Sequence, residues 1–359
     1  MALTMVLAGC ATTPAATPAN PDLPTPAPVP APPRPAPERG PAALPGWNSE
    51  DHLAAFEAYA VGCVAAREGA ARVQCARAMQ IKQTSKPVTP SAARAFFESG
   101  FTIVPAETAD GRPGLLTSYF APEYPARTTP DAEFDAPVLA RPAGLTQGQT
   151  LPVRAEIEAD PQGVSGAPPL AWMRAEDLFF MQIQGSGYLT LEDGSRVRAA
   201  YAADNGQPFT GIARPMAERG LLPQNGTSGD AIRGWLAAHR GPEAREVMAL
   251  NPRYIFFGLD PDDGGDPAGA AGIPLPARRS IAVDPASWRY GDLVWISADG
   301  GDLAGARGSY QGLVVALDTG SAIRGPVRAD LYMGRGEAAG AEAGAVRHPL
   351  RMWRLVPRG

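Results

Sequence analysis

The sequence predicts a mainly β protein that begins with a few helices. From residue 115 onwards, the apolar residues form short runs rich in β-branched and aromatic side chains, and Gly, Pro, Asp or Asn bounds each run. Such runs are typical of strands. Before residue 115, apolar residues recur instead at helical spacing. The chain also contains 40 glycines and 39 prolines, more than average usage, which predicts many turns and loops.

Length and composition exclude several classes of protein. With 359 residues, of which 45% are hydrophobic and 19% charged, the chain has room for two domains or one large one and can bury a sizeable core. It is not a coiled coil, a polytopic membrane protein or a wholly disordered chain. The formal net charge is −5 and no block of Lys and Arg supplies a basic face, so we expect no nucleic-acid partner. The three Cys and three His lack the spacing of a zinc site, so we expect no metal.

The first ten residues resemble the signal of an exported lipoprotein. Residues 1–9 are apolar, and Leu7-Ala8-Gly9-Cys10 resembles the lipobox, where bacterial lipoproteins are cleaved and acylated on the Cys. The run is too short to span a bilayer, which needs about 20 residues, but it fits the core of a secretory signal. No Lys or Arg precedes it, so either the true start lies upstream or the segment is a frayed terminus. Residues 11–46, rich in Pro and Ala, are expected to form an extended tether.

Two short antiparallel helices are expected at the start of the ordered chain. Apolar residues recur at helical spacing over residues 53–63 and again over 73–79, and Gly69 separates the two stretches. That hairpin would bring Cys63 and Cys75 close together, and in an exported protein they could form a disulfide. Two buried thiols are the alternative.

A third helix is expected to begin at Thr89-Pro90 and to run through Phe96 and Phe97. The Thr side chain can cap the first turn by accepting a backbone N–H bond. Proline suits the first helical position, where no N–H donor is needed.

Ten strands are expected after the helices. They are Leu115–Phe120, Phe179–Gln184, Leu189–Leu191, Arg196–Tyr201, Tyr254–Phe257, Ser280–Val283, Leu293–Ile296, Leu313–Leu317, Asp330–Met333 and Met352–Val356. Asp193-Gly194 is typical of the turn of a β-hairpin and would join two of them. One further helix is expected over Ala231–His239.

Three aspartates stand at the ends of apolar strands. Asp284 follows the strand that ends at Val283, Asp318 closes the strand that ends at Leu317, and Asp330 opens the next strand. A carboxyl group in such a place is partly desolvated, which raises its pKa and suits it to donate a proton. For each aspartate alone, the alternative is that it caps a turn by accepting backbone N–H bonds.

Several motifs resemble the membrane-bound lytic murein transglycosylase A family. In chain order they are Thr117 to Pro122, Phe180 to Tyr188, Tyr201 to Pro208, Ser280 to Asp284, Val315 to Gly325 and Arg328 to Gly334, and the resemblance covers roughly residues 47–358. The sequence departs from the family at Ser118 and Ser321, where Gly is usual. It also has Phe120 where the family usually has Tyr, which would remove one hydrogen bond to a sugar.

The resemblance implies a fold and an activity. The fold would be a discontinuous double-psi β-barrel made of residues 47–121 and 257–359, with a second β domain inserted at 122–256. A groove between the two would hold a glycan strand of peptidoglycan. The family cleaves the β-1,4 bond between N-acetylmuramic acid and N-acetylglucosamine without water and closes a 1,6-anhydro ring, as a glycan lyase of the exotransglycosylase type. We expect a monomer without cofactor, anchored through Cys10 to the periplasmic face of the outer membrane.

The resemblance also assigns residues to the site. Asp330 matches the catalytic acid, and Asp318 and Asp284 match two further aspartates to which we assign supporting roles. Amide and hydroxyl groups on a rigid strand edge suit hydrogen bonding to sugars, and a tyrosine ring can stack on a sugar face. The candidates that line the sugar groove are Tyr119, Gln184, Ser186, Gly187, Tyr201, Asn205 and Gln207.

A single carboxyl group can carry this reaction. Most glycosidases need two carboxylates, one on each side of the bond that is cut. Here Asp330 would protonate the glycosidic oxygen and then accept the proton of the muramic C6 hydroxyl as that oxygen attacks C1. The attack is intramolecular, so no activated water is needed. Ionised Asp318 would help to keep the proton on Asp330.

Two other functions are considered. Asp318-Thr319-Gly320-Ser321 is also the motif of an aspartic peptidase, but the chain has one copy of it and would have to dimerise. The chain could also be a lipoprotein that binds peptidoglycan without cleaving it. The acidic run from Asp260 to Asp266 lacks the closing Glu of an EF-hand and is expected to be a solvated surface loop.

Overall fold

The structure is a computed structural model that describes residues 39–359 except 68, 147, 224–227 and 304. Cys10 and residues 11–38 of the expected tether lie outside the described residues. Within those residues, every helix is too short or too polar to cross a bilayer.

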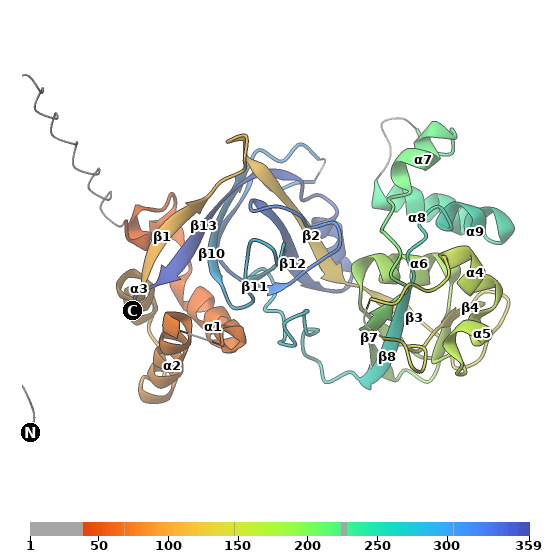
Figure 1. Cartoon of the computed structure of the whole chain (residues 1–359), viewed down its shortest axis with the longest axis horizontal. Helices are drawn as coiled ribbons and strands as arrows, with labels where there is room; N and C mark the ends of the chain where they lie inside the picture. The colour runs from red at the N-terminus through yellow and green to blue at the C-terminus, as the bar shows by residue number, and fades with distance from the viewer. Residues whose placement is uncertain (1–38, 68, 147, 224–227, 304) are drawn as a thin grey trace, which may run out of the picture. The chain divides into compact units, whose positions relative to one another are not determined.

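Six strands close a barrel, and they come from two distant parts of the chain (Figure 1). They are β2 (Gly114–Ala121), β9 (Ser280–Val283), β10 (Leu293–Asp299), β11 (Ser309–Asp318), β12 (Arg328–Arg335) and β13 (His348–Pro357). Their order is β13-β10-β11-β9-β12-β2, and β2 pairs again with β13, which closes the ring. The pairs β11–β9 and β12–β2 are parallel, and β1 (Phe101–Ala106) extends along β13. The mainly β fold and the discontinuous barrel predicted from the sequence are confirmed.

Side chains alternate along β12, so some of them point into the barrel interior and the others point outwards. Ala329 and Leu331 belong to a buried cluster to which all six barrel strands contribute, so this cluster fills the interior. Consecutive residues of a strand point to opposite faces. Asp330 therefore lies on the outer face, where it is the register partner of Thr117 on β2.

Helices cover part of that outer face near the N-terminus of the described chain. They are η1 (Pro41–Ala43), η2 (Trp47–Ser49), α1 (His52–Gly62), η3 (Cys63–Ala65), α2 (Gly69–Thr84) and α3 (Pro90–Gly100). Phe96 and Phe97 of α3 pack in one buried cluster with Leu313 and Val315 of β11. The expected cap of α3 is present, because Thr89 Oγ1 accepts a hydrogen bond from the amide of Ala92.

Two close contacts fix α1. A Cβ atom at Gly62 would lie 2.8 Å from Val315 Cγ1, so the absence of a side chain lets the helix approach β11. A disulfide joins Cys63 to Cys75 of α2, with their Cα atoms 5.4 Å apart. The helical hairpin therefore has both a packed and a covalent connection.

Residues 123–261 form two further sheets. The four-stranded sheet has the order β3-β6-β7-β8, and β4 pairs with β5. The strands are β3 (Glu123–Pro125), β4 (Ala136–Val138), β5 (Ala171–Met173), β6 (Gly187–Thr190), β7 (Arg196–Asp204) and β8 (Ile255–Pro261). The hairpin between β6 and β7 turns at Asp193-Gly194, as predicted, with Gly194 at φ 83°. The domain boundary expected between residues 256 and 257 falls inside β8, which stays paired with β7 up to Pro261.

More helix is present after β2 than the sequence predicted. The expected helix over Ala231–His239 corresponds to α8, and the others were not foreseen. The helices are α4 (Arg154–Ala159), α5 (Pro161–Ser165), α6 (Ala175–Gln184), α7 (Ala213–Glu218), α8 (Gly229–Ala238), α9 (Pro242–Met248) and, between β12 and β13, α10 (Gly336–Ala343).

The strand predicted over Phe179–Gln184 is wrong, because these residues form the end of α6. Met181 packs in one buried cluster and Phe179 in another, so the helix is buried on two sides. A helix buried on two sides has a continuous apolar run that resembles a buried strand. Gly185 ends it in the left-handed conformation, at φ 86°.

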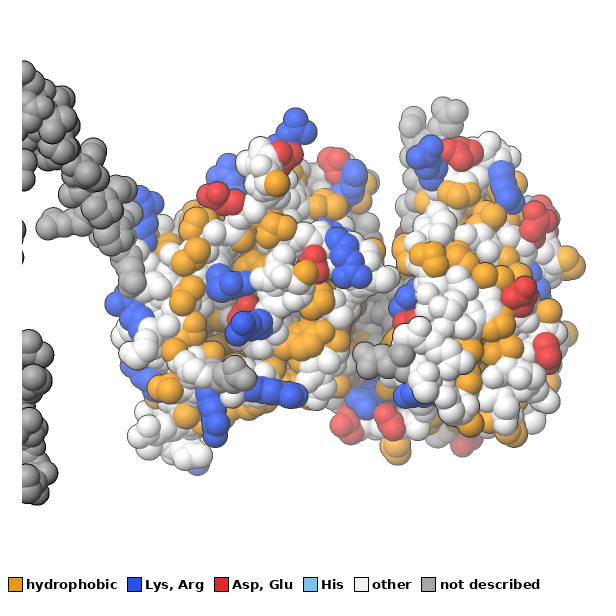
Figure 2. Space-filling model, viewed as in Figure 1, with side chains coloured by type: hydrophobic (Ala, Val, Ile, Leu, Met, Phe, Trp, Pro, Cys, Tyr) orange, Lys and Arg blue, Asp and Glu red, His pale blue; other side chains and the backbone are white. Residues whose placement is uncertain are grey.

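Charged side chains of both signs are mixed over the face of the molecule shown in Figure 2. Many arginines lie beside a carboxylate, as Arg214 does with Glu218 at 2.7 Å and Arg245 with Asp135 at 2.5 Å. Exposed pairs of this kind contribute only about 0–1 kcal/mol each. The apolar clusters therefore supply most of the stability of the fold.

Candidate functional site

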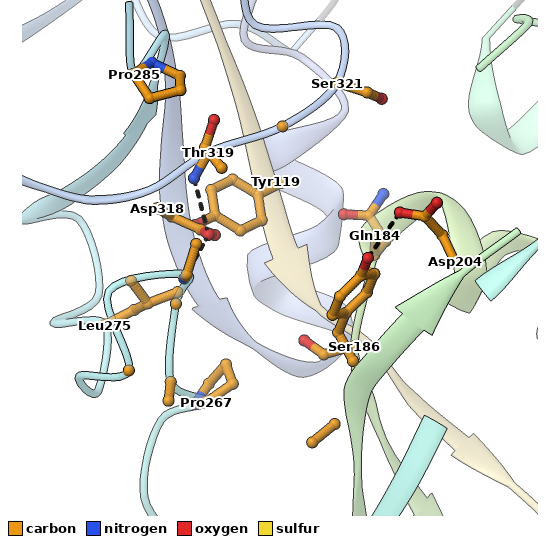
Figure 3. A pocket seen from close by; sticks show the side chains of 18 of the residues that line it. Tyr119, Gln184, Ser186, Asp204, Pro267, Leu275, Pro285, Asp318, Thr319 and Ser321 are labelled. Atoms are coloured by element: carbon orange, nitrogen blue, oxygen red, sulfur yellow. Dashed lines mark hydrogen bonds between the residues drawn. The ribbon is translucent and has the colours of Figure 1, made fainter. Parts of the chain in front are cut away.

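A cavity of about 800 Å³ lies beside the end of β11. Figure 3 shows Tyr119, Asp318 and Thr319 on one side of it and Gln184, Ser186 and Asp204 on the other. The barrel, the insert sheet and the segment between β8 and β9 all contribute to the lining. The polar residues among them are Tyr119, Gln184, Ser186, Arg198, Tyr201, Asp204, Arg253, Asp318, Thr319, Ser321 and Arg324.

Asp318 is held at the cavity by three hydrogen bonds. Its Oδ1 accepts from the amides of Ala270, at 2.8 Å, and Thr319, at 2.9 Å, and its Oδ2 accepts from the Tyr119 hydroxyl at 2.6 Å. A register shift between Ala316 and Asp318 interrupts the pairing of β11 with β9, and such irregularities re-aim a side chain. Burial raises the pKa of Asp318, while the three donors oppose that rise.

Asp330 lies on β12 and does not itself line the cavity. Thr117 of the neighbouring strand donates its hydroxyl hydrogen to Asp330 Oδ1. Burial raises the pKa of Asp330, and the nearby Asp318 charge adds to the rise. The bond from Thr117 and the positive charge of Arg328 act in the opposite direction. A buried carboxyl next to an acidic neighbour retains its proton to higher pH, as a general acid requires.

Asp284 is committed to backbone amides. Its Oδ2 accepts from Gly325 at 2.7 Å and its Oδ1 from Ala286 at 3.1 Å, and Arg324 Nη1 lies 3.8 Å from Oδ1. These two amide bonds lower the pKa of Asp284. Gly325 belongs to the loop that connects β11 to β12, so Asp284 fixes the segment between Asp318 and Asp330. Asp284 therefore caps a turn by accepting backbone N–H bonds, which was the alternative considered for each aspartate alone.

A glycine and alanine segment closes one side of the cavity. A Cβ atom at Gly269 would lie 2.6 Å from the carbonyl oxygen of Leu317, so only glycine lets this segment approach β11. That approach brings the amide of Ala270 to Asp318. Sequence reasoning missed the segment because it offers backbone rather than side chains.

Four of the seven expected groove residues line the cavity. They are Tyr119, Gln184, Ser186 and Tyr201. Tyr201 is 51% exposed and donates its hydroxyl hydrogen to Asp204 Oδ2 at 2.6 Å. Gln184 Oε1 lies 3.4 Å from the amide of Phe120, which connects the end of α6 to β2.

The other three expected groove residues, Gly187, Asn205 and Gln207, are not among those that line this cavity. Asn205 is fully buried: its Nδ2 donates to the carbonyls of Pro152 and Pro252, both at 2.9 Å. Gln207 Nε2 donates to the carbonyl of Leu151 at 2.9 Å. These amide groups hold loops together, and both polar atoms of the Asn205 side chain are used in this way.

Gly187 has a packing role. A Cβ atom there would lie 2.9 Å from Met181 Cγ of α6, so the glycine lets β6 lie against the helix. Phe120, where the family has Tyr, packs beside the cluster in the barrel interior and against Gly340 of α10. The missing hydroxyl at position 120 therefore does not face the cavity.

Charged cavity residues were missed by the sequence analysis. Arg253 Nη2 pairs with Asp204 Oδ2 at 2.6 Å, and Arg198 Nη2 with Asp260 Oδ2 at 3.0 Å. Asp204 stands inside the Tyr201 to Pro208 motif, which was a usable signal. Nothing in the sequence marks the arginines. Among the described residues, no cluster of His, Cys, Asp or Glu side chains could hold a metal ion.

Comparisons with known proteins agree with this architecture. Residues 115–258 match the model of the MltA specific insert domain, and residues 279–356 match the 3D domain. The membrane-bound lytic murein transglycosylase A of Vibrio cholerae is 34% identical over 250 residues, and the match covers 67% of this chain. The chain spans 65% of the length of that relative.

Two solved structures extend the similarity. A membrane-bound lytic murein transglycosylase from Agrobacterium tumefaciens has a TM-score of 0.74 at 31% identity, and the match covers 89% of this chain and 97% of that one. E. coli MltA with bound chitohexaose has a TM-score of 0.68 at 28% identity, covering 85% and 90%. Together with the closed six-stranded barrel, they identify the fold as a double-psi β-barrel with an inserted domain. The chain belongs to the membrane-bound lytic murein transglycosylase A family.

Proposed function

We propose that the protein is a lytic transglycosylase. It cleaves the β-1,4 bond between N-acetylmuramic acid and N-acetylglucosamine in peptidoglycan and closes a 1,6-anhydro ring on the muramic residue. One observation carries the proposal: Asp330 and Asp318, two carboxyl groups whose pKa values are raised by burial, lie close enough for the Asp318 charge to act on Asp330, next to a cavity. The relatives are named lytic murein transglycosylases, and one solved relative is described with bound chitohexaose.

Asp330 acts as both acid and base. Its proton passes to the glycosidic oxygen as the bond from that oxygen to muramic C1 breaks. The C6 hydroxyl oxygen then bonds to C1, and its proton goes to the Asp330 carboxylate. No water is consumed, and the attacking hydroxyl is held in the same ring as C1, which replaces an activated nucleophile.

Asp318 and Asp284 support this chemistry without reacting. Both oxygens of Asp318 already accept hydrogen bonds from the protein, which commits the group to holding charge near Asp330. Like-charged neighbours raise the pKa of a carboxyl group, so ionised Asp318 helps Asp330 to keep its proton. Asp284 keeps the connecting loop in place through Gly325. With these roles for Asp318 and Asp284, Asp330 is the one carboxyl group that reacts.

Glycan binding is assigned to the cavity residues. Gln184, Ser186 and Tyr201 can bond to sugar hydroxyls, and the exposed Tyr201 ring offers a stacking surface. Tyr119 is assigned to holding Asp318 as well as to the lining. We further infer a monomer anchored by acylated Cys10 on the periplasmic face of the outer membrane. The tether would end before residue 39, earlier than the expected residue 46, because Leu44 packs in the core and residues 41–43 form η1. The membrane-bound relatives support an envelope location.

Digestion of purified sacculi followed by mass spectrometry tests the function. We expect soluble muropeptides that end in 1,6-anhydro-muramic acid. Asp330→Asn should lower the rate by at least ~10²-fold, the usual contribution of a general acid, with an unchanged circular dichroism spectrum. Asp318→Asn should be impaired but active. Asp302→Asn, an exposed aspartate outside the cavity, is the matched control.

The same digest separates the alternatives. In H₂¹⁸O, incorporation of ¹⁸O at C1 would indicate hydrolysis and contradict the proposal. An aspartic peptidase would release peptides, leave the glycan intact and respond to pepstatin. A protein that only binds peptidoglycan would sediment with sacculi and yield no soluble product.

A further inference from the structure

A chain of two hydrogen bonds connects Arg328 to Asp330 through Thr117. Arg328 Nη2 donates to Thr117 Oγ1 at 2.9 Å, and Thr117 Oγ1 donates to Asp330 Oδ1. The other terminal nitrogen, Nη1, donates to the carbonyl oxygen of Ala329 at 2.5 Å and lies 3.4 Å from that of Leu115. The guanidinium group is therefore fixed by backbone oxygens of two strands.

The chemistry of the three groups sets the direction of both bonds. A guanidinium group has donors and no acceptor, so Thr117 Oγ1 must accept from Arg328. The Thr117 hydroxyl carries one hydrogen, which is then available only for Asp330. Asp330 Oδ1 accepts that hydrogen. The carbonyl oxygen of a neutral carboxyl group is a better acceptor than its hydroxyl oxygen, so the bond from Thr117 favours the proton of neutral Asp330 on Oδ2.

We propose that Arg328 is a positioning residue for the acid–base step, because it acts through Thr117 to hold the Asp330 proton on Oδ2 and to stabilise the carboxylate left after that proton is donated. The inference rests on the proposed function, in which Asp330 donates a proton and later accepts one. The inference concerns which oxygen of Asp330 donates and accepts the proton, and which cation stabilises the Asp330 carboxylate between these two steps.

The charged and titratable groups around Asp330 show why a cation is needed near it. On its own strand these are Arg328 and Tyr332, β2 presents Tyr119, and Asp318 stands at the end of β11. The aspartate that follows β9, Asp284, is bonded to backbone amides. Burial and Asp318 favour the protonated form of Asp330, whereas Arg328 is the cation that favours its ionised form. Without it, Asp330 would hold its proton more firmly and would donate it less readily.

Titration of the Asp330 carboxyl group by ¹³C NMR tests the inference on the full chain without substrate. We expect Arg328→Met and Thr117→Val each to raise the pKa of Asp330 by about one unit, the lower end of the effect of a neighbouring opposite charge. The double variant should shift the pKa by less than the sum of the two single shifts, because the bond from Thr117 to Asp330 depends partly on Arg328. Thr117→Ser, which keeps the hydroxyl, should restore the wild-type value.

Two further variants keep the test decisive. Arg351→Met, at an exposed arginine of β13, is the matched control and should leave the pKa of Asp330 unchanged. Arg328→Lys keeps the charge but loses the fork that reaches both Thr117 and the backbone, so its shift should lie between wild type and Arg328→Met. If Arg328→Met does not fold, the Lys variant and Thr117→Val provide the same comparison.

The outcomes separate the inference from the proposed function. In the folded Arg328 variants, Asp330 should stay protonated to higher pH. The basic limb of the pH–rate profile of digestion should therefore move to higher pH together with the measured pKa of Asp330. An unchanged Asp330 pKa in these variants, or additive shifts in the double variant, would overturn the role of Arg328 and leave the transglycosylase assignment standing. Full activity of Asp330→Asn would overturn the transglycosylase mechanism and with it the role of Arg328, whatever the titration shows.

Discussion

The Tyr119 hydroxyl donates a 2.6 Å hydrogen bond to Asp318 Oδ2 and so joins β2 to the end of β11, although β9 and β12 lie between them in the sheet. The Tyr119 ring packs against Tyr332, with 5.4 Å between the ring centroids. While this bond holds, the Asp318 carboxylate stays turned towards Tyr119. The charge that acts on Asp330 is therefore placed by a tyrosine from the N-terminal part of the barrel.

Tyr119→Phe should shift the pH profile of digestion. The change removes a donor that favours ionised Asp318 and keeps the ring, so the pKa of Asp318 should rise. A neutral Asp318 no longer raises the pKa of Asp330, so the basic limb of the pH–rate profile should move to lower pH by up to about one unit. Tyr59→Phe, at a buried tyrosine of α1, is the control. A profile identical to wild type would contradict this role for Tyr119.

Asp284→Asn should destabilise the protein and lower its activity together. The amide side chain can present one acceptor, so either Gly325 or Ala286 loses its partner. Both donors are partly exposed, so losing one of these bonds costs about 0.5–1.5 kcal/mol of unfolding free energy. Urea denaturation measures that loss, and digestion of sacculi measures the activity. If stability is unchanged while activity falls, Asp284 has a direct chemical role instead.

Part of the site could be predicted from the sequence, because the spacing of residues along a strand determines which face each side chain occupies. Apolar residues alternate along β12 and leave Asp330 on the outer face, which a period of two residues already indicates. Tyr119 and Gln184 stand in motifs that resemble the family, and both line the cavity. Residue type and spacing were sufficient there.

The rest could not be predicted, for separate physical reasons. An Asn on a buried loop and an Asn that binds a sugar have the same side chain, so Asn205 was assigned to the groove although its bonds go to backbone carbonyls. The run Phe179–Gln184 is apolar on two sides, which hides its helical period. Asp262 was expected in a solvated loop, yet its side chain is only 6% exposed and pairs with Arg335. The two residues are 73 positions apart in the sequence, so no local pattern indicated the pair.

Stability at acidic pH should depend on Asp262. Arg335 donates two hydrogen bonds to its carboxylate, at 3.0 and 2.8 Å, and lowers the pKa of Asp262 to about 2. A pKa depressed below the unfolded value of about 3.9 stabilises the fold above pH 4. That contribution is lost as the pH falls from 4 towards 2. Urea denaturation at pH 7, 4 and 2.5 should show a shallower acid loss for Asp262→Asn than for wild type.

Arg335→Met should be more harmful at neutral pH than Asp262→Asn. It leaves the Asp262 carboxylate buried without its main cation and also removes the guanidinium from the face of Tyr188, 3.4 Å from the ring centroid. Because the pair is only partly buried and Arg196 Nε stays 3.3 Å from Asp262, we expect a loss of about 1–3 kcal/mol. Arg289→Met, at an exposed arginine, is the control. Equal stability of Arg335→Met and wild type at pH 7 would contradict a structural role for this pair.

Arg324 differs from the other cavity arginines in its pairing. Arg198 and Arg253 lie within 3.0 Å of a carboxylate, whereas Arg324 Nη1 is 3.8 Å from Asp284 and its side chain is 63% exposed. A loosely held guanidinium at the rim of the cavity, which we propose binds glycan, can bind anions. Peptidoglycan carries carboxylates on its stem peptides and on muramic groups freed of peptide.

Arg324→Gln should therefore raise KM for stem-peptide-bearing glycan by about two- to fivefold, the effect of one exposed charge pair, and leave kcat unchanged. Chitohexaose is uncharged, so its Kd should be the same for both proteins by calorimetry. Added salt should weaken the binding of the anionic glycan to wild type and should have less effect on the variant, because screening acts on the interaction that the variant lacks. Arg347→Gln, at another exposed arginine, controls for net charge. Equal loss of affinity for chitohexaose would instead assign Arg324 to the sugar ring and exclude a preference for anions.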